Sequence, residues 1–132
     1  MRLLLDTHIL LWMLEANPQL SVEARELIRN TANEVFVSAA SLMEIAIKTK
    51  IGKLDTQRTP TEITREMTHM LAIQLLPVLP QHLDAYQSVP LFDDHRDPFD
   101  RLLIATALAE GFTLISDDRK FERYTHLIAI VN

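Results

Sequence analysis

The chain has 132 residues, 48% of them hydrophobic, which suits one globular domain spanning residues 1–132. It contains no cysteine, so disulfide scaffolds, thiolate catalysis and cysteine-ligated zinc are excluded. The formal net charge of −5 is opposite in sign to that of proteins that hold nucleic acid by bulk electrostatics.

The first half of the chain alternates short apolar runs with amphipathic segments. The apolar run that ends before Asp6 is too short for a secretory signal, and no run approaches the ~20 residues that cross a bilayer. A soluble, cytoplasmic protein is therefore expected, with no membrane partner. The predicted elements are a strand over 3–5, helices over 8–14 and 21–31, a strand over 35–37 and a helix over 40–51 closed by Gly52.

The second half begins with a strong helix start, in which Thr59 and Glu62 have the spacing of a capping box and Pro60 suits the first helical position. Pro77 cannot donate a backbone hydrogen bond, so the strand around it is expected at an edge of the sheet. The predicted elements are helices over 59–71, 81–89 and 97–110, a helical turn over 119–124, and strands over 75–78, 113–115 and 127–131.

This alternation of strands and helices predicts an α/β domain built on a mostly parallel sheet of about five strands. In such folds, ligands bind at the carboxyl ends of the strands.

Four acidic residues fall at positions that the topology brings to this edge. Asp6 directly follows the first strand, and Asp118 follows the strand over 113–115. Glu44 and Asp100 lie in the first turns of helices. Because the N-terminus of each helix meets the same edge as the strand ends, the four carboxylates are expected to converge.

Clustered carboxylates repel one another, and without a counter-charge some of them hold protons at neutral pH. A hard divalent cation relieves this repulsion, and Mg²⁺ or Mn²⁺ prefers oxygen ligands. Such an ion activates water and stabilises charge on a phosphate group. The predicted chemistry is therefore hydrolysis of a phosphoester.

An alternative interpretation makes each acid a helix cap. Asp6 and Asp118 stand at cap positions, and Asp97 precedes Pro98 where a helix starts. The segment from Ser41 to Glu44 also has capping-box spacing. The four acids share one predicted edge of the sheet, which favours a metal site over caps. Capping alone, however, would also place acids at helix starts.

Four segments together resemble the PIN-domain family, and most closely its VapC-type toxin ribonucleases. These segments are LLLDTHILLW, VSAASLMEIAIK, HRDPFDRLLIATAL and LISDDRKF. They occur in the family's order between residues 3 and 121. The resemblance implies a three-layer α/β/α fold, one or two Mg²⁺ or Mn²⁺ ions, cleavage of single-stranded RNA, a homodimer and a cognate antitoxin protein.

The resemblance also implies roles for individual residues. The catalytic metal ligands that it implies are Asp6, Glu44, Asp100 and Asp118. Asp97 and Asp117 are possible further ligands, because each lies close to one of these four in the sequence. Thr7 and Ser116 match small hydroxyl positions that hold a carboxylate or a water at the metal.

Basic residues flank the predicted acidic edge and are candidates for RNA phosphates, with solvated surface as the alternative. These RNA-binding candidates are Arg96, Arg101, Arg119 and Lys120. A second basic cluster consists of Lys48, Lys50 and Lys53. Lys48 lies four residues after Glu44, which favours a helix ion pair there.

His8 and His95 are expected near the site as supporting residues, and Trp12 and Phe36 in the core. An aspartyl-phosphate phosphatase is disfavoured because His8 stands where that chemistry needs a second aspartate. A phospho-receiver domain is also disfavoured, because this chain lacks the aspartate at the end of a middle strand and the lysine after the last strand that such a domain needs. The remaining alternatives are a stand-alone RNA-processing nuclease of the PIN type and a PIN-like binding module without activity.

Overall fold

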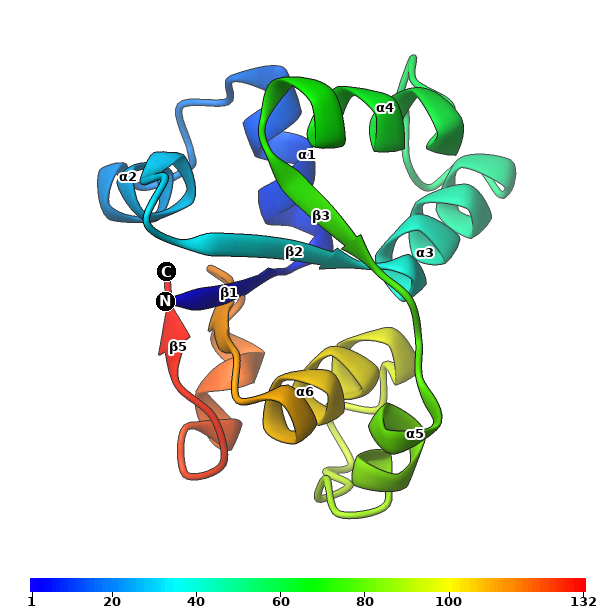
Figure 1. Cartoon of the computed structure of the whole chain (residues 1–132). Helices are drawn as coiled ribbons and strands as arrows, with labels where there is room; N and C mark the ends of the chain where they lie inside the picture. The colour runs from blue at the N-terminus through cyan, green and yellow to red at the C-terminus, as the bar shows by residue number, and fades with distance from the viewer.

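A five-stranded parallel sheet runs through the computed structural model, which describes residues 1–132, and helices cover both of its faces (Figure 1). The strands lie in the order β3-β2-β1-β4-β5. Their bounds are Arg2–Leu5 for β1, Glu34–Ser38 for β2, Ile73–Leu76 for β3, Thr113–Ile115 for β4 and Ile130–Val131 for β5. The predicted fold class, a parallel sheet of about five strands in an α/β/α arrangement, is confirmed.

Side chains alternate between the two faces of the sheet, and each face has its own core. Leu3 and Leu5 of β1 pack with the side of the sheet that α1, α2 and α4 cover. Leu4 faces the opposite side, under α6 and the 3₁₀ helix η1. The helices are α1 Thr7–Glu15, α2 Val22–Arg29, α3 Ala39–Lys50, α4 Pro60–Met70, α5 Pro80–Tyr86, α6 Pro98–Glu110 and η1 Arg119–Tyr124.

The predicted helix boundaries rest on capping groups that the structure contains. Thr59 Oγ1 accepts a hydrogen bond from the amide of Glu62, and the Glu62 carboxylate accepts one from the amide of Thr59. Gly111 ends α6 with a φ of 73°, a left-handed conformation that glycine adopts without strain. The side chain of Asp97 caps the start of α6, so this helix begins and ends at fixed points and its first turn has a defined position.

Two strand predictions were wrong in their bounds. The edge strand β3 covers Ile73–Leu76 rather than 75–78, because Pro77 lacks an amide hydrogen and the strand ends before it. The last strand is only Ile130–Val131, because the amides of Leu127 and Ile128 donate to the carbonyl of Tyr124 in a turn.

Strands β1 and β2 run in parallel toward the carboxyl edge of the sheet, where α3 begins (Figure 1). Helix α3 contacts both α1 and α6. The ends of β1 and β4 and the starts of α3 and α6 therefore meet at this carboxyl edge. None of the helices combines the length and the apolar character that a membrane-spanning segment needs.

Candidate active site

Asp6 occupies the centre of the carboxyl edge, immediately after β1. It is the N-cap residue of α1, but its carboxylate makes no capping hydrogen bond, so the cap interpretation is wrong here. Instead Oδ2 accepts a hydrogen bond of 2.8 Å from Ser116 Oγ, which lies beyond the neighbouring strand β4. The side chain is buried, with 5% of the residue exposed.

The pKa of Asp6 is raised from 3.8 to about 6, chiefly by burial; the hydrogen bond from Ser116 acts in the opposite direction, and the charge of Asp100 adds to the rise. Burial disfavours a charged carboxylate because the protein interior solvates charge poorly. The aspartate is thus held in an environment that a positive ion would stabilise.

Glu44 lies in α3, one turn after its start, and is also buried. Its carboxylate accepts a hydrogen bond of 2.7 Å from Thr7 Oγ1 and lies 2.7 Å from the ammonium of Lys48. The predicted helix ion pair between Lys48 and Glu44 is therefore confirmed. The hydrogen bond with Glu44 raises the pKa of Lys48.

Asp100 lies in the first turn of α6, where a chain of buried polar groups supports it. Its Oδ2 is 2.9 Å from Nε2 of His95, and Nδ1 of the same ring is 2.9 Å from the hydroxyl of Tyr124. Burial raises the pKa of Asp100, and the charges of Asp97 and Glu44 raise it as well, against the lowering effect of His95. The expectation of His95 as a supporting residue agrees with this geometry.

Asp97 and Asp118 are the acids for which the cap interpretation is correct. One oxygen of Asp97 accepts from the amides of Phe99 and Asp100. Asp118 accepts from the amide of Lys120 at the start of η1, and its side chain is exposed. A cap does not exclude a second oxygen from binding a ligand. Asp118 stays linked to the centre, because its amide donates to the same Ser116 Oγ that binds Asp6.

Ser41 is a site feature that the sequence did not reveal. Its hydroxyl is the one buried side-chain polar atom without a hydrogen-bond partner, and the residue is 1% exposed. The capping box predicted for Ser41 and Glu44 is absent, since Ser38 caps α3 through the amide of Ala40. Buried polar groups are normally satisfied, so an unpaired hydroxyl one turn before Glu44 leaves room for a water or ligand contact.

The three buried or half-buried acids lie close enough to influence one another, because Asp100 affects the pKa of Asp6, and Glu44 that of Asp100. As the side chains stand, no group of three or more acids or histidines is arranged so that it could hold a metal ion. Serine, threonine, lysine and histidine partners engage the oxygens instead. The donor set nevertheless fits Mg²⁺ or Mn²⁺, which bind carboxylate oxygens and retain waters.

The predicted RNA-binding residues differ in their surroundings. Arg119 and Lys120 are exposed, and Arg96 is exposed beside Asp93 at 3.0 Å. Arg101 is buried, with 5% of the residue exposed, and donates to the carbonyls of Val89 and Pro90. Arg101 therefore holds the segment before α6 in place, and its burial argues against the predicted contact with RNA.

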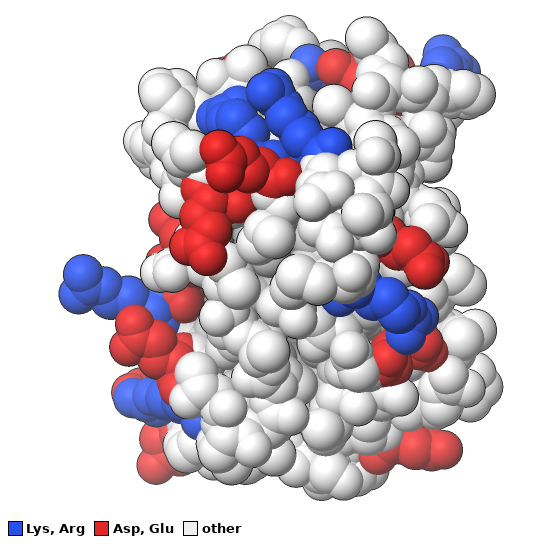
Figure 2. Space-filling view, turned by 60° about the vertical axis from the view of Figure 1, so that its left-hand side comes forward, with Lys and Arg blue, Asp and Glu red and all other residues white.

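Neither positive nor negative charge dominates the face of the molecule shown in Figure 2. Acidic and basic side chains lie beside one another there, around a broad uncharged area. Any contact with an anionic polymer must therefore depend on local groups rather than on the net charge of −5.

Parallel α/β domains bind their ligands at the carboxyl ends of the strands. In this chain buried carboxylates lie at that edge, so it is of the class of α/β proteins with an acidic site there. The family model of the PIN domain matches residues 3–127. The chain therefore belongs to the PIN-domain family, as the four sequence segments predicted.

Relatives of this chain carry toxin–antitoxin names. It is 27% identical to ribonuclease VapC22 of Mycobacterium tuberculosis over 124 residues, which cover 93% of this chain and 92% of that protein. Its fold resembles VapBC2 from Rickettsia felis, solved bound to a promoter DNA fragment, with a TM-score of 0.70, 19% identity and coverage of 100% and 98%. FitAcB from Neisseria gonorrhoeae gives a TM-score of 0.64, 18% identity and coverage of 98% and 96%.

Proposed function

We propose that this protein is a cytoplasmic endoribonuclease that hydrolyses phosphodiester bonds of single-stranded RNA with Mg²⁺ or Mn²⁺. The observation that carries the proposal is the buried carboxylate of Asp6, whose pKa is raised to about 6 and which lies within electrostatic reach of Asp100. Membership of the PIN-domain family and the ribonuclease name of a relative support the same chemistry.

The chain's own residues orient the acids of this site. Ser116 fixes one oxygen of Asp6, Thr7 fixes one oxygen of Glu44, and His95 fixes one oxygen of Asp100. Asp6 and Asp100 each keep a second oxygen for the ion. The second oxygen of Glu44 is paired with Lys48, which would have to move for Glu44 to bind the ion, and Asp118 completes the proposed ligand set. A bound divalent ion would supply an activated water and neutralise charge on the scissile phosphate.

The metal requirement is tested with purified protein and a labelled single-stranded RNA. Cleavage is expected with Mg²⁺ or Mn²⁺ and is expected to stop with EDTA, because the ion supplies the activated water. Re-addition of Mn²⁺ in excess should restore the rate, which controls for irreversible damage by the chelator. Undiminished cleavage in EDTA would contradict the proposal.

A small antitoxin protein is the proposed partner, by analogy with the VapBC complexes that the fold resembles. The ion pair between Lys48 and Glu44 supports this, because it places an ammonium on one of the acids. A basic side chain from a partner would make the same kind of charge-assisted contact and occupy the position of the metal. Such an insertion would block cleavage.

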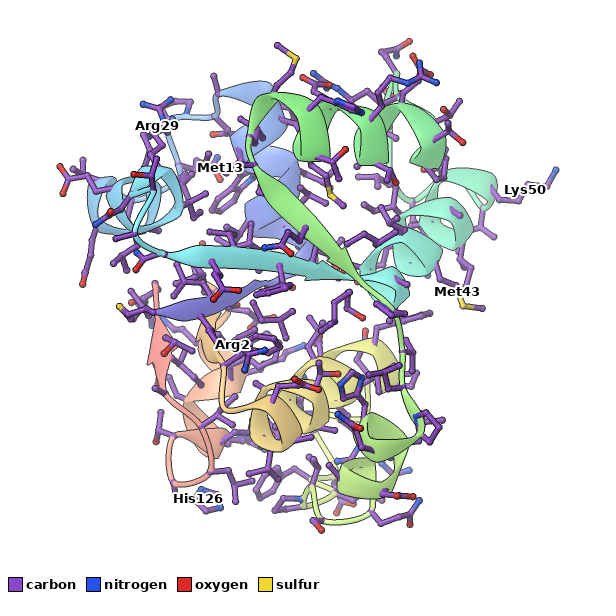
Figure 3. All side chains as sticks on the ribbon, in the orientation of Figure 1. Arg2, Met13, Arg29, Met43, Lys50 and His126 are labelled. Carbon is purple, nitrogen blue, oxygen red and sulfur yellow. The ribbon has the colours of Figure 1, made fainter.

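A homodimer is the proposed assembly, and an apolar stripe on α3 is the surface that favours it. Met43, Ile47 and Ile51 follow one another at four-residue spacing and are 59%, 40% and 58% exposed. Figure 3 shows Met43 directed away from the body of the molecule. A second copy of the chain would cover this stripe, since exposed apolar surface of this kind favours association.

Expression without a partner separates a toxin from a stand-alone nuclease. We expect growth to slow when the chain alone is induced, and to recover with Asp6→Asn, because RNA cleavage is the source of the toxicity. The matched control is the same Asp6→Asn protein at equal abundance on an immunoblot. Normal growth with enzyme that is active in the lysate would remove the toxin role and leave a stand-alone RNA-processing nuclease. Wild-type protein without cleavage would favour an inactive PIN-like binding module.

A further inference from the structure

A cavity of about 230 Å³ lies between α1 and α3, beside the acids but separate from them. Its polar lining comes from Thr7, His8, Lys48 and Lys53. The rest of its wall consists of apolar side chains of α1 and α3 together with Leu54. No acidic residue lines the cavity, so its charge is opposite to that of the neighbouring carboxylates.

Two residues join this cavity to the candidate active site. Thr7 donates its hydroxyl hydrogen to Glu44, and Lys48 lies 2.7 Å from the same carboxylate. A group held in the cavity would therefore lie next to a group bound at the acids. Lys48 would contact both.

The fold holds the second lysine in place. Gly52 has a φ of 75°, and this left-handed residue turns the chain back after α3. The amides of Lys53 and Leu54 then donate to the carbonyl of Lys48, at 2.8 and 3.1 Å. The turn thus ties the backbone of Lys53 to that of Lys48 and brings both side chains to the wall of one cavity.

The start of α1 adds a third positive feature. Asp6 stands at the N-cap but makes no capping hydrogen bond, and the first turn of α1 contains no acidic residue. The first amides of this helix therefore lack a side-chain partner and contribute the positive end of the helix dipole near Thr7 and His8. An anion in the cavity would meet the side chains of Lys48 and Lys53, close to this end of the helix.

We infer that this cavity is a subsite for a phosphate of the RNA backbone, one that neighbours the phosphate cleaved at the acids. The inference rests on the proposed ribonuclease function and deepens it. A phosphate fits because lysines bind phosphate as point charges, and backbone phosphates of single-stranded RNA recur at short intervals along the chain. The subsite also explains how a protein of net charge −5 holds an anionic polymer, since local cations carry the contact.

The test compares Lys53→Ala with Lys50→Ala as a matched control. Lys50 lies on α3 only three residues earlier, does not line the cavity, and points away from the molecule in Figure 3. Both lysines are exposed, so neither change is expected to unfold the chain. Binding of a short fluorescein-labelled single-stranded RNA is measured by fluorescence anisotropy, with Ca²⁺ replacing Mg²⁺ to suppress cleavage.

Lys53→Ala is expected to weaken RNA binding about fivefold and to reduce the slope of log K against log salt by about 0.7, the value for one phosphate contact on a single strand. Lys50→Ala should match the wild type in both. Equal binding by all three proteins would overturn the subsite and leave the nuclease standing. A wild type that neither binds nor cleaves RNA would overturn both. Binding of a labelled Asp- and Glu-rich peptide is measured in the same way. If Lys53→Ala weakens binding of this peptide but not of RNA, the cavity would instead be assigned to a protein partner.

Discussion

Replacing Asp6 with asparagine is expected to lower the kcat/KM of RNA cleavage by about three orders of magnitude or more, as removal of a principal catalytic group does. The change keeps the shape of the side chain and its hydrogen bond with Ser116 but removes the charge that would bind the ion. The same loss is expected for Glu44→Gln, Asp100→Asn and Asp118→Asn. Cleavage of a labelled RNA under single-turnover conditions gives the measurement.

The matched control is Asp97→Asn, one helical turn before Asp100. Asp97 caps α6 through two amides, and asparagine caps a helix as well as aspartate does. We therefore expect this variant, and Asp117→Asn, to retain most of the activity. An active Asp6→Asn enzyme would contradict the role given to Asp6. An inactive Asp97→Asn with an active Asp100→Asn would move the metal ligand along α6 by one turn.

The metal-free protein is expected to lose stability as pH rises from about 4 to about 6, through the titration of Asp6. Its pKa lies near 6 in the folded chain against 3.8 for an exposed aspartate, so the folded state binds more protons than the unfolded state across this interval. The free energy of unfolding therefore falls with rising pH. At pH 7 the full cost is about 3 kcal/mol, because each pKa unit corresponds to about 1.4 kcal/mol.

The measurement is the difference in unfolding free energy between wild type and Asp6→Asn, followed by urea denaturation in EDTA at several pH values. Taking this difference removes carboxylates with the opposite behaviour, such as Glu110, whose pKa is lowered by His82. Relative to the wild type, the free energy of unfolding of the variant should rise by roughly 2 kcal/mol between pH 4 and pH 7. Mg²⁺ at pH 7 should stabilise the wild type more than the variant. A difference that does not change with pH would show that Asp6 is not held in a costly charged state.

Local patterns were sufficient to predict the positions of the candidate ligands along the fold. The run of leucines ending at Asp6 marks the end of β1, and the Asp97-Pro98 start fixes Asp100 in the first turn of α6. Both depend on interactions within a few residues, which sequence patterns capture. Strands β1, β2 and β4 pair in parallel, so their carboxyl ends lie at one edge of the sheet, where Asp6 follows β1.

The partners of the side chains could not be predicted in this way, because they come from contacts between distant segments. Nothing in the sequence around Arg101 distinguishes an exposed arginine from one bound to the carbonyls of Val89 and Pro90. The link from Asp100 through His95 to Tyr124 also joins separate elements. The unpaired hydroxyl of Ser41 becomes visible only once its surroundings are packed.

The central claim is that the carboxylates at this edge bind a divalent ion, and anomalous diffraction from crystals soaked in Mn²⁺ tests it most directly. We expect a manganese peak in contact with Asp6 and Asp100, with Lys48 displaced from Glu44 and waters completing the coordination. Peaks confined to other parts of the surface, with Lys48 still paired to Glu44, would contradict the metal centre.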